Sequence, residues 1–426
     1  MNDQTPSHDK RVAGLKGLGS SRKRVEDARF TQGKGTYVDD IKMVGMVYGD
    51  FVRSQYAHAR IKSVNSTSAM AVPGVIAVLL AKDFAPLGLH WMPTLAGDKQ
   101  MVPADGKVLF QGQEIAFVVA ADKYALADAL ELVVVDSEEL PVVTDSFNAM
   151  AQNAPVLRAD LAGQTKGAHG ERNHHNHIFR WEVGDKTAVE AVVASADVVA
   201  EEMVYYHRTH PCPLETCGCV ASMDKINGKL TLWGTFQAPH VVRTVASLLS
   251  GIPESNIRVV SPDIGGGFGN KVGVYPGYVC SIVASIVTGR PVKWIENRMD
   301  NLMATAFVRD YRMQGKIAAT KEGKITGLWC HLAADHGAFD ACADPTRFPR
   351  RFLQHMHGFL QHPGRLSGGG RGLYQQGAGR GGVSLFLPGD QGCVFHQTHD
   401  RGAGDQAEHG CSRTAADQLH PQEQFP

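Results

Sequence analysis

The 426-residue sequence lacks several features that would assign it to a class at once. No apolar run reaches the roughly 20 residues that a membrane-spanning helix needs, so we do not expect an integral membrane protein. The basic residues before position 25 are not followed by the apolar core of a secretory signal. The 43 basic residues balance 43 acidic ones, which argues against nucleic acid as a partner.

The eight cysteines also lack a metal-binding pattern. They form no CxxC pair and no iron–sulfur or zinc-finger spacing, although three of them lie between residues 212 and 219. We therefore expect reduced thiols in a cytoplasmic protein, and no metal held by this chain. The histidines between residues 174 and 177 are better explained by a polar turn before a strand than by a metal site.

The most distinctive stretch is residues 257–271, which read IRVVSPDIGGGFGNK. The pattern predicts a strand at 257–260 and a buried helix over 276–288 that starts at Pro276 and stops at Gly289. Because glycine has no Cβ, a glycine loop between a strand and a helix lets backbone N–H groups approach a ligand closely. The stretch matches neither the dinucleotide fingerprint nor the P-loop, and a tight turn without a ligand is the alternative.

The remaining patterns predict an α+β fold. Residues 25–145 carry short apolar runs and one helix capped by Asp122, which suits a small mixed sheet with helices packed on it. Hairpins are predicted around the turns at 227–228 and 322–323. Gln237 lies at the end of the first hairpin, where its side chain either binds a ligand or bonds to nearby backbone.

The composition changes after residue 350. Residues 351–426 contain no Ile, Lys, Asn or Trp, but 15 Gly, 10 Gln and 7 His. A disordered glycine-rich tail is one explanation, and translation in a shifted frame is the other. Allowed codons for Arg380–Gly389, read one base later, spell Gly-Val-Ala-Tyr-Arg-Cys-Ser-Phe-Arg. We therefore expect a frameshift near Arg350, arising in the gene or in its sequencing.

Several strings, taken together and in this order, resemble a known family. They are RVEDARFTQGKGTYVDDI (24–41), FVRSQYAHARIKSV (51–64), GQEIAFVVAADKYALADALELVVVDSEELPVV (112–143), GTFQAPHVVR (234–243), DIGGGFGNKVGVYP (263–276) and ADHGAFDACADPTRFP (334–349). Over about residues 24–349 they resemble the large, molybdenum-carrying chain of the xanthine dehydrogenase/aldehyde oxidase family, in its aerobic carbon monoxide dehydrogenase branch.

The resemblance implies a domain order. A flexible lead-in (1–24) would precede an α/β hammerhead domain (25–145), a linker (146–164) and an incomplete first molybdopterin-binding α+β domain (165–349). Residues 350–426 would be an aberrant tail, disordered or frameshifted.

The resemblance also implies a cofactor and its binding residues. The cofactor would be a molybdopterin cytosine dinucleotide with molybdenum, joined by copper in the carbon monoxide branch. Gln237, Gly266, Gly267, Phe268 and Gly269 would bind it. No catalytic residue or metal ligand is assigned, because the family's second cofactor domain, its glutamate beside the metal and its copper-carrying loop Ala-Tyr-Xaa-Cys-Ser-Phe-Arg do not occur in the sequence.

The implied activity is that of an oxidoreductase. The intact enzyme would oxidise CO with water to CO2 and pass electrons to a small chain with [2Fe–2S] clusters and a medium chain with FAD. We expect neither the clusters nor FAD in this chain. We expect a dimer of heterotrimers in the cytoplasm, either free or associated with the inner face of the cytoplasmic membrane. A related aldehyde or N-heterocycle hydroxylase, or a non-catalytic truncated chain, are the alternatives, and we expect the chain as written to be inactive.

Overall fold

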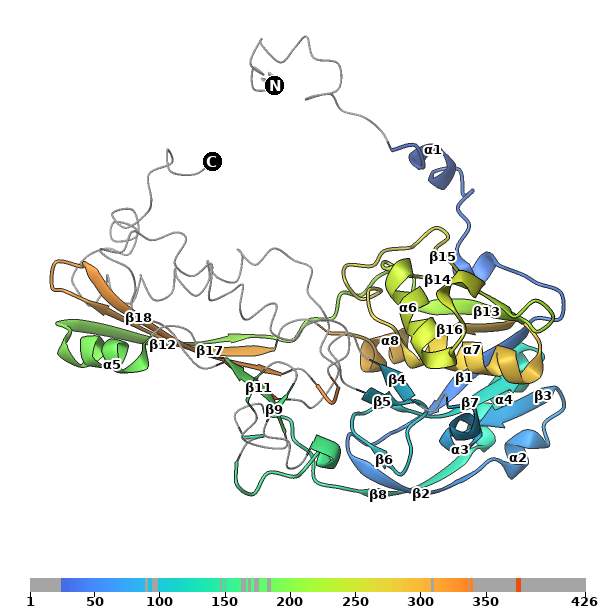
Figure 1. Cartoon of the computed structure of the whole chain (residues 1–426), viewed down its shortest axis with the longest axis horizontal. Coiled ribbons are helices and arrows are strands. Elements are labelled where there is room, and N and C mark those ends of the chain that lie inside the picture. Colours follow the sequence, from blue (N-terminus) through green and yellow to red (C-terminus); the bar gives the residue numbers. More distant parts are fainter. Residues whose placement is uncertain are drawn as a thin grey trace, which may run out of the picture.

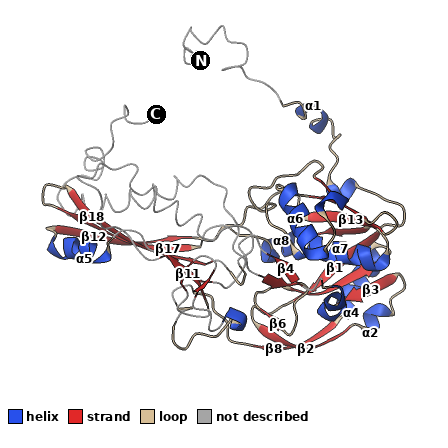
Figure 2. Ribbon diagram, in the orientation of Figure 1, coloured by secondary structure: helices blue, strands red, loops and turns tan. Residues whose placement is uncertain are grey.

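A computed structural model gives the fold of the chain (Figure 1). It describes residues 24–88, 91–93, 99–145, 148–149, 151–161, 166–167, 170–171, 176–181, 185–307, 310–335, 337–339 and 373–376. These residues form a broad lobe of helices and strands, from which a long narrow sheet extends (Figures 1 and 2). None of the described helices is both long enough and apolar enough to span a bilayer.

The first unit is built around β7 (Glu114–Ala120), whose seven residues are all buried. This strand pairs antiparallel with β1 (Val47–Arg53) and with β3 (Val75–Leu79). A strand covered on both faces needs no polar alternation, which explains its continuous apolar run. The helix α4 (Lys123–Leu132) follows, and the carboxylate of its predicted cap, Asp122, accepts two N–H groups of the first turn.

The other elements of this unit are short. They are α1 (Asp27–Phe30), the 3-10 turn Val38–Asp40, β2 (Ala59–Asn65), α2 (Thr67–Met70), α3 (Ala81–Phe84), the 3-10 turn Ala85–Leu87, β4 (Trp91–Pro93), β5 (Lys99–Met101), β6 (Lys107–Val108), β8 (Val134–Glu139) and the 3-10 turn Ala159–Leu161. β6, β2 and β8 form a second, three-stranded sheet under the first one, and β4 pairs with β5.

The main sheet continues into the second unit. β1 pairs in parallel with β16 (Val292–Ile295), with Val47 opposite Val292. One seven-stranded sheet therefore runs in the order β15-β14-β13-β16-β1-β7-β3. The boundary expected between residues 145 and 165 divides the sequence but not this sheet.

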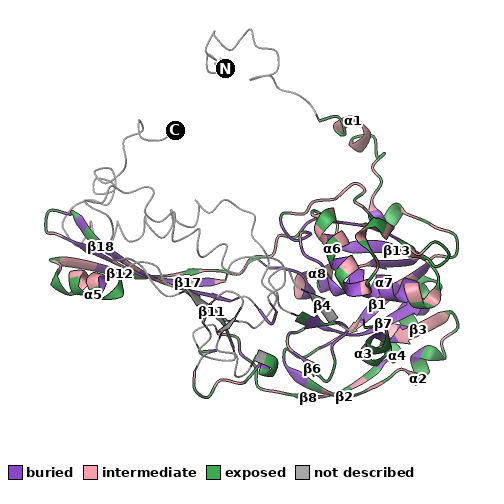
Figure 3. Cartoon of the chain, viewed as in Figure 1, coloured by how far each residue is buried: buried purple, intermediate pink, exposed green. Residues whose placement is uncertain are grey.

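The second unit supplies the rest of the lobe. The hairpin predicted around residues 227–228 is β13 (Gly218–Asp224) and β14 (Lys229–Gly234), and β15 (Ile257–Val260) lies parallel to β14. α7 (Pro276–Thr288) has its predicted bounds, and ten of its 13 residues are buried against the sheet (Figure 3). The remaining elements are α6 (Pro239–Ser250), the 3-10 turn Glu254–Asn256 and α8 (Arg298–Ala304).

The long sheet contains the second predicted hairpin, β17 (Tyr311–Ala319) and β18 (Ile325–Asp335). Its order is β12-β17-β18-β19-β11-β10-β9, and α5 (Lys186–Ser195) packs against β17 and β18. The other strands are β9 (Lys166–Gly167), β10 (Gly170–Glu171), β11 (His177–Trp181), β12 (Val198–Tyr206) and β19 (Leu373–Gln376).

The two predicted end segments fall largely outside the described residues. Of the lead-in at 1–24, only Arg24 is described, and of the tail at 350–426, only residues 373–376. Those four residues form β19, parallel to β18 and antiparallel to β11. We did not predict this strand, because four residues are too few for an alternating pattern to stand out.

Candidate functional site

The glycine loop and Gln237 meet at one edge of the main sheet. Gln237 follows β14, and the loop follows β15. Because these strands are parallel, with Leu230 opposite Ile257, both chains leave the sheet at the same end. In open sheets with parallel strands, the carboxyl ends of the strands are the usual place for a ligand.

Gln237 holds the loop in place. Its Oε1 accepts the N–H groups of Gly269 and Lys271, both at 3.1 Å, and its own N–H donates to the Lys271 carbonyl at 3.0 Å. A Cβ on Gly267 would lie 2.4 Å from the Gln237 side chain, so a larger residue does not fit there. The Gln237 Nε2 has no partner among the described residues and is free to donate to a ligand. Both roles considered for this side chain are therefore compatible.

The loop carries backbone N–H groups that have no acceptor among the described residues. Gly266, Phe268 and Gly269 all have positive φ, at 94°, 53° and 89°. Phe268 is a non-glycine residue in the left-handed region, which costs about 1–3 kcal/mol and is typical of ligand sites. In the described structure no group accepts the N–H of Gly266, Gly267 or Phe268. Successive unpaired N–H groups of this kind are suited to bind an anion, and the Phe268 side chain in the same loop is exposed (56%).

An ion pair fixes the start of the loop. The Nζ of Lys271, a residue with no exposed surface, lies 2.9 Å from the Glu215 Oε2. The same oxygen accepts the Gly265 N–H at 2.8 Å, and the Glu215 N–H donates to the Gly265 carbonyl at 3.1 Å. A buried ammonium group requires such a partner, so the pair and the loop conformation depend on each other. We did not single out either residue, and only their proximity to the glycine run marks them.

The end of the loop is buried. Asn270 Nδ2 donates to Thr305 Oγ1 at 2.9 Å and to the Ala306 carbonyl at 3.3 Å. The Asn270 N–H closes a turn onto the Gly267 carbonyl at 2.9 Å, and the Tyr275 hydroxyl donates to the Asn270 carbonyl. The loop is thus held from both ends before any ligand binds.

A buried charge cluster is joined to the loop through Asn301, whose Nδ2 donates to Glu296 at 2.8 Å and to Asn270 at 3.5 Å. Arg53, at the end of β1, contacts Glu114 at 3.1 Å and Asp300 at 3.2 Å. Burial raises the pKa of Asp50 to about 6 and that of Glu296 to about 7. Burial also raises the pKa of Asp300, so one arginine faces four carboxyl groups, three of which hold protons more strongly than usual.

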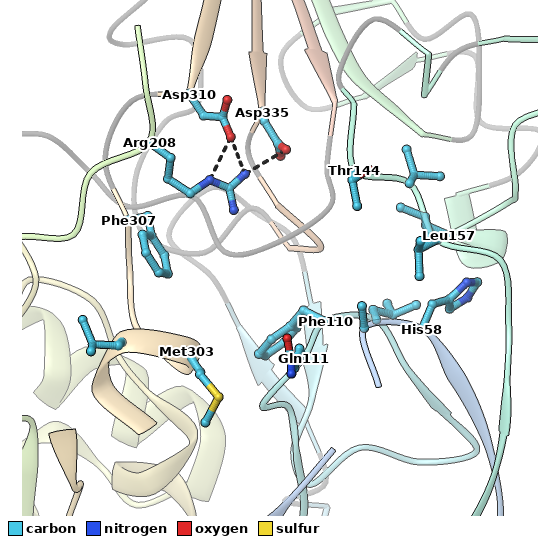
Figure 4. A pocket seen from close by; sticks show the side chains of 15 residues that line it. His58, Phe110, Gln111, Thr144, Leu157, Arg208, Met303, Phe307, Asp310 and Asp335 are labelled. Carbon is cyan, nitrogen blue, oxygen red and sulfur yellow. Dashed lines mark hydrogen bonds and ion pairs between the residues drawn. The ribbon is translucent and has the colours of Figure 1, made fainter. Parts of the chain in front are cut away.

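A hollow lies between the lobe and the long sheet. It encloses about 400 Å³ and is lined by both apolar and polar side chains. Figure 4 shows Arg208 at its wall, where the Nε donates to Asp310 at 2.8 Å and the Nη2 to Asp335 at 2.9 Å, with Phe307 beside it. We did not predict this cluster, because its members are far apart in the sequence.

Among the described residues no group of three or more His, Cys, Asp and Glu side chains is placed to hold a metal. His174 and His175 lie outside the described residues, as do the cysteines at 342, 393 and 411. Cys217 and Cys219 are buried, and burial raises the pKa of the Cys219 thiol to about 12. These two thiols are therefore protonated in the core of the lobe.

Two family models match the chain. The aldehyde oxidase and xanthine dehydrogenase a/b hammerhead domain matches residues 32–141, and the molybdopterin cofactor-binding domain matches residues 169–364. The first match lies within the unit expected at 25–145, and the second begins within the unit expected at 165–349 but extends 15 residues into the segment expected as an aberrant tail.

Individual relatives are similar over most of the chain. The carbon monoxide dehydrogenase large chain of Afipia carboxidovorans is 63% identical over 366 residues, which are 85% of this chain and 45% of that one. The nicotine 6-hydroxylase large subunit of Paenarthrobacter nicotinovorans is 34% identical over 328 residues, 76% of this chain and 38% of that one. The solved structure of reconstituted CO dehydrogenase from Oligotropha carboxidovorans gives a TM-score of 0.90 at 55% identity, and the match covers 99% of this chain and 52% of that one. The chain spans about half the length of these relatives, or less.

Proposed function

The chain belongs to the xanthine dehydrogenase/aldehyde oxidase family, and we propose that its glycine loop forms one wall of the molybdenum cofactor site of a carbon monoxide dehydrogenase. The fold is a hammerhead domain followed by a molybdopterin-binding domain, and both belong to a molybdenum oxidoreductase. The proposal goes further, because it assigns a binding role to Gln237, Gly266, Gly267, Phe268 and Gly269.

One observation supports this assignment: the unpaired hydrogen-bond donors of the site lie on the glycine loop and on Gln237, which holds the loop in place. The N–H groups of Gly266, Gly267 and Phe268 and the amide Nε2 of Gln237 are available in the described structure. A molybdenum cofactor presents oxygen atoms and phosphate groups, which accept hydrogen bonds. The residues present therefore fit this group.

The chain's own part in the chemistry is to position the cofactor. Gln237 would donate from Nε2, the loop would donate from its backbone, and the Phe268 ring would cover an apolar part of the ligand. Such donors act without reorganisation because Glu215, Lys271 and Asn270 already hold the loop. When bound, the cofactor supplies the redox chemistry.

We propose oxidation of CO with water to CO2 as the reaction of the whole enzyme. The greater similarity to a carbon monoxide dehydrogenase (63%) than to a nicotine hydroxylase (34%) supports CO over an N-heterocycle. We further propose that the cofactor is the cytosine dinucleotide form and that copper lies beside the molybdenum. The partners would be chains that carry FAD and [2Fe–2S] clusters, in a dimer of heterotrimers located in the cytoplasm.

Cofactor content tests the proposal. The full chain is produced in a host that makes the cofactor, together with the expected partner chains, and molybdenum and cytosine nucleotide are measured per protein. We expect both in the wild type, and a several-fold loss in Gln237→Ala, because the loop loses two accepted N–H bonds and the ligand loses a donor. The matched control is Gln314→Ala, which removes an exposed amide bonded to Glu201 on the long sheet. A folded wild type without molybdenum, or equal content in Gln237→Ala, would contradict the assignment.

A further inference from the structure

The hollow between the lobe and the long sheet has the size and lining of a small-molecule site. It encloses about 400 Å³, within the roughly 300–1,000 Å³ that ligand pockets span. Its lining includes two aromatic rings from different units: Phe110, which precedes β7, and Phe307, which follows α8. Leu302 and Met303 of α8 add aliphatic surface. The described lining includes no residue of the glycine loop, so this hollow is separate from the proposed cofactor site.

The polar wall of the hollow is built around Arg208. Its Nε donates to Asp310 at 2.8 Å, and its Nη2 donates to Asp335 at 2.9 Å. Its Nη1 has no hydrogen-bond partner among the described residues, and in Figure 4 this nitrogen points away from both carboxylates. Because the guanidinium is planar and rigid, the two bonds that hold it also fix the direction of the remaining donor. One oriented donor is therefore available to a ligand.

The two carboxylates of this wall are already engaged. The Oδ1 of Asp310 accepts the Tyr205 hydroxyl at 3.0 Å, and its Oδ2 accepts from Arg208. The Oδ1 of Asp335 accepts the Gly337 N–H at 2.7 Å, and its Oδ2 accepts from Arg208. Each carboxylate oxygen thus has a donor, whereas Arg208 has one donor to spare. The matching group on a ligand is a hydrogen-bond acceptor.

The charge of the wall disfavours an anion as that acceptor. One guanidinium lies against two carboxylates, which leaves an excess of one negative charge. His58, also in the lining, does not offset this charge at pH 7, because burial lowers the pKa of its imidazole. A carboxylate or phosphate group would therefore meet net repulsion, and an uncharged acceptor would not.

The backbone at this wall is held in an unusual conformation. Asp310 has a φ of 76°, in the left-handed region that non-glycine residues rarely adopt. Its N–H donates to the Tyr206 carbonyl at 3.1 Å, and its own carbonyl accepts the Asp335 N–H at 3.1 Å. Strained residues that neighbours hold in this way are found mainly at ligand sites and active sites. The strain lies at the residue that orients Arg208.

We propose that this hollow is a binding site for an uncharged aromatic molecule that carries a carbonyl group or a similar hydrogen-bond acceptor. The acceptor would lie at Arg208 Nη1, and the ring system would pack against Phe110 and Phe307. The volume accommodates a ligand of about two fused rings. The proposal does not depend on the proposed function, because the two sites share no described residue.

The test is the binding of prodan, an uncharged naphthalene ketone whose emission moves to shorter wavelength in apolar surroundings, to the full chain. Three competitors with the same ring are then compared: acetylnaphthalene, which has an uncharged acceptor, ethylnaphthalene, which has none, and naphthoate, which has a charged one. A hydrogen bond from a charged donor is worth about tenfold or more in affinity, so acetylnaphthalene should displace prodan at about tenfold lower concentration than ethylnaphthalene. Naphthoate should also be weaker than acetylnaphthalene. Equal displacement by ethylnaphthalene, or stronger displacement by naphthoate, would overturn the proposal without any variant.

Two variants locate the site. Thr144→Trp introduces a large ring at an exposed residue of the lining and should weaken prodan binding several-fold, whereas Thr67→Trp, at an exposed residue of α2 outside the lining, should bind like the wild type. Arg208→Lys keeps the charge beside Asp310 and Asp335 but loses the third nitrogen, so acetylnaphthalene and ethylnaphthalene should become equal competitors. Absence of an emission shift in the wild type, unchanged binding in Thr144→Trp, or an unchanged preference in Arg208→Lys would each show that the hollow does not bind this class of ligand.

Discussion

Replacement of Glu215 by Gln should show how much the loop depends on its ion pair. Gln has the shape of Glu and can still accept the Gly265 N–H, which donates at 2.8 Å in the structure. It cannot balance the charge of Lys271, whose Nζ lies 2.9 Å from the carboxylate and whose side chain has no exposed surface. The substitution therefore isolates the effect of the charge from that of the loop hydrogen bond.

The expected cost follows from the burial of the two partners. Removal of one member of a fully buried ion pair costs about 3–5 kcal/mol, because the other charge is left without compensation. Glu215 is 20% exposed, so water reaches part of the pair, and we expect a loss of about 2–4 kcal/mol in the free energy of unfolding. The double variant Glu215→Gln/Lys271→Met should recover at least half of this loss, since it buries no unpaired charge.

Urea unfolding of the full chain, followed by the fluorescence of buried Trp294, measures these differences. The matched control is Glu254→Gln, which breaks the half-exposed pair with Arg243 at 3.1 Å and should cost less than about 1 kcal/mol. A loss below about 1 kcal/mol in Glu215→Gln, or no recovery in the double variant, would show that the pair does not hold the loop.

The remaining predictions concern the loop, the buried carboxyls and the tail. Gly267→Ala should displace Gln237, because its Cβ would lie 2.4 Å from that side chain, and should lower the molybdenum content at least as much as Gln237→Ala; full content would refute this. Asp50 and Glu296 have raised pKa values of about 6 and 7, so the folded chain holds protons that the unfolded chain releases above about pH 4. The stability that Asp50 and Glu296 contribute is therefore present below about pH 4 and is lost as the pH rises to about 7, by at most about 3 kcal/mol per group. Urea unfolding at pH 5 and pH 8 should show this loss of stability, and the loss should be smaller in Asp50→Asn. Sequencing the coding DNA across codons 345–426 should reveal a shifted frame that resumes the family pattern, and an uninterrupted native frame would end that hypothesis.

Local patterns predicted the elements around the site well. The strand at 257–260 and the helix at 276–288 have their expected bounds, because an apolar run, a proline and a glycine mark them without tertiary information. The hairpin around residues 227–228 followed from the turn residues in the same way. These signals lie within a few residues of the feature that they predict.

Features that join distant parts of the chain were not predicted. The parallel pairing of Val47 with Val292 has no local signal, since either strand would suit many partners. The same is true of Arg208 with Asp310 and Asp335, which are brought together only by the folding of the long sheet. Gln237 illustrates the limit most clearly: its place at a strand end was evident, but its bonds to the loop follow from two parallel strands ending side by side.

The shared sheet gives the hammerhead domain a direct connection to the loop. Arg53, at the end of β1, contacts Asp300 at 3.2 Å in α8. The next residue of that helix, Asn301, accepts the Thr305 hydroxyl at 2.5 Å through its carbonyl, and Thr305 accepts from Asn270 in the loop at 2.9 Å. Every link of this path is polar and at least half buried, so a change in one partner leaves an unsatisfied group that the next must accommodate. The hammerhead domain therefore supports the loop through α8, and the cofactor site that we propose at this loop would depend on both units.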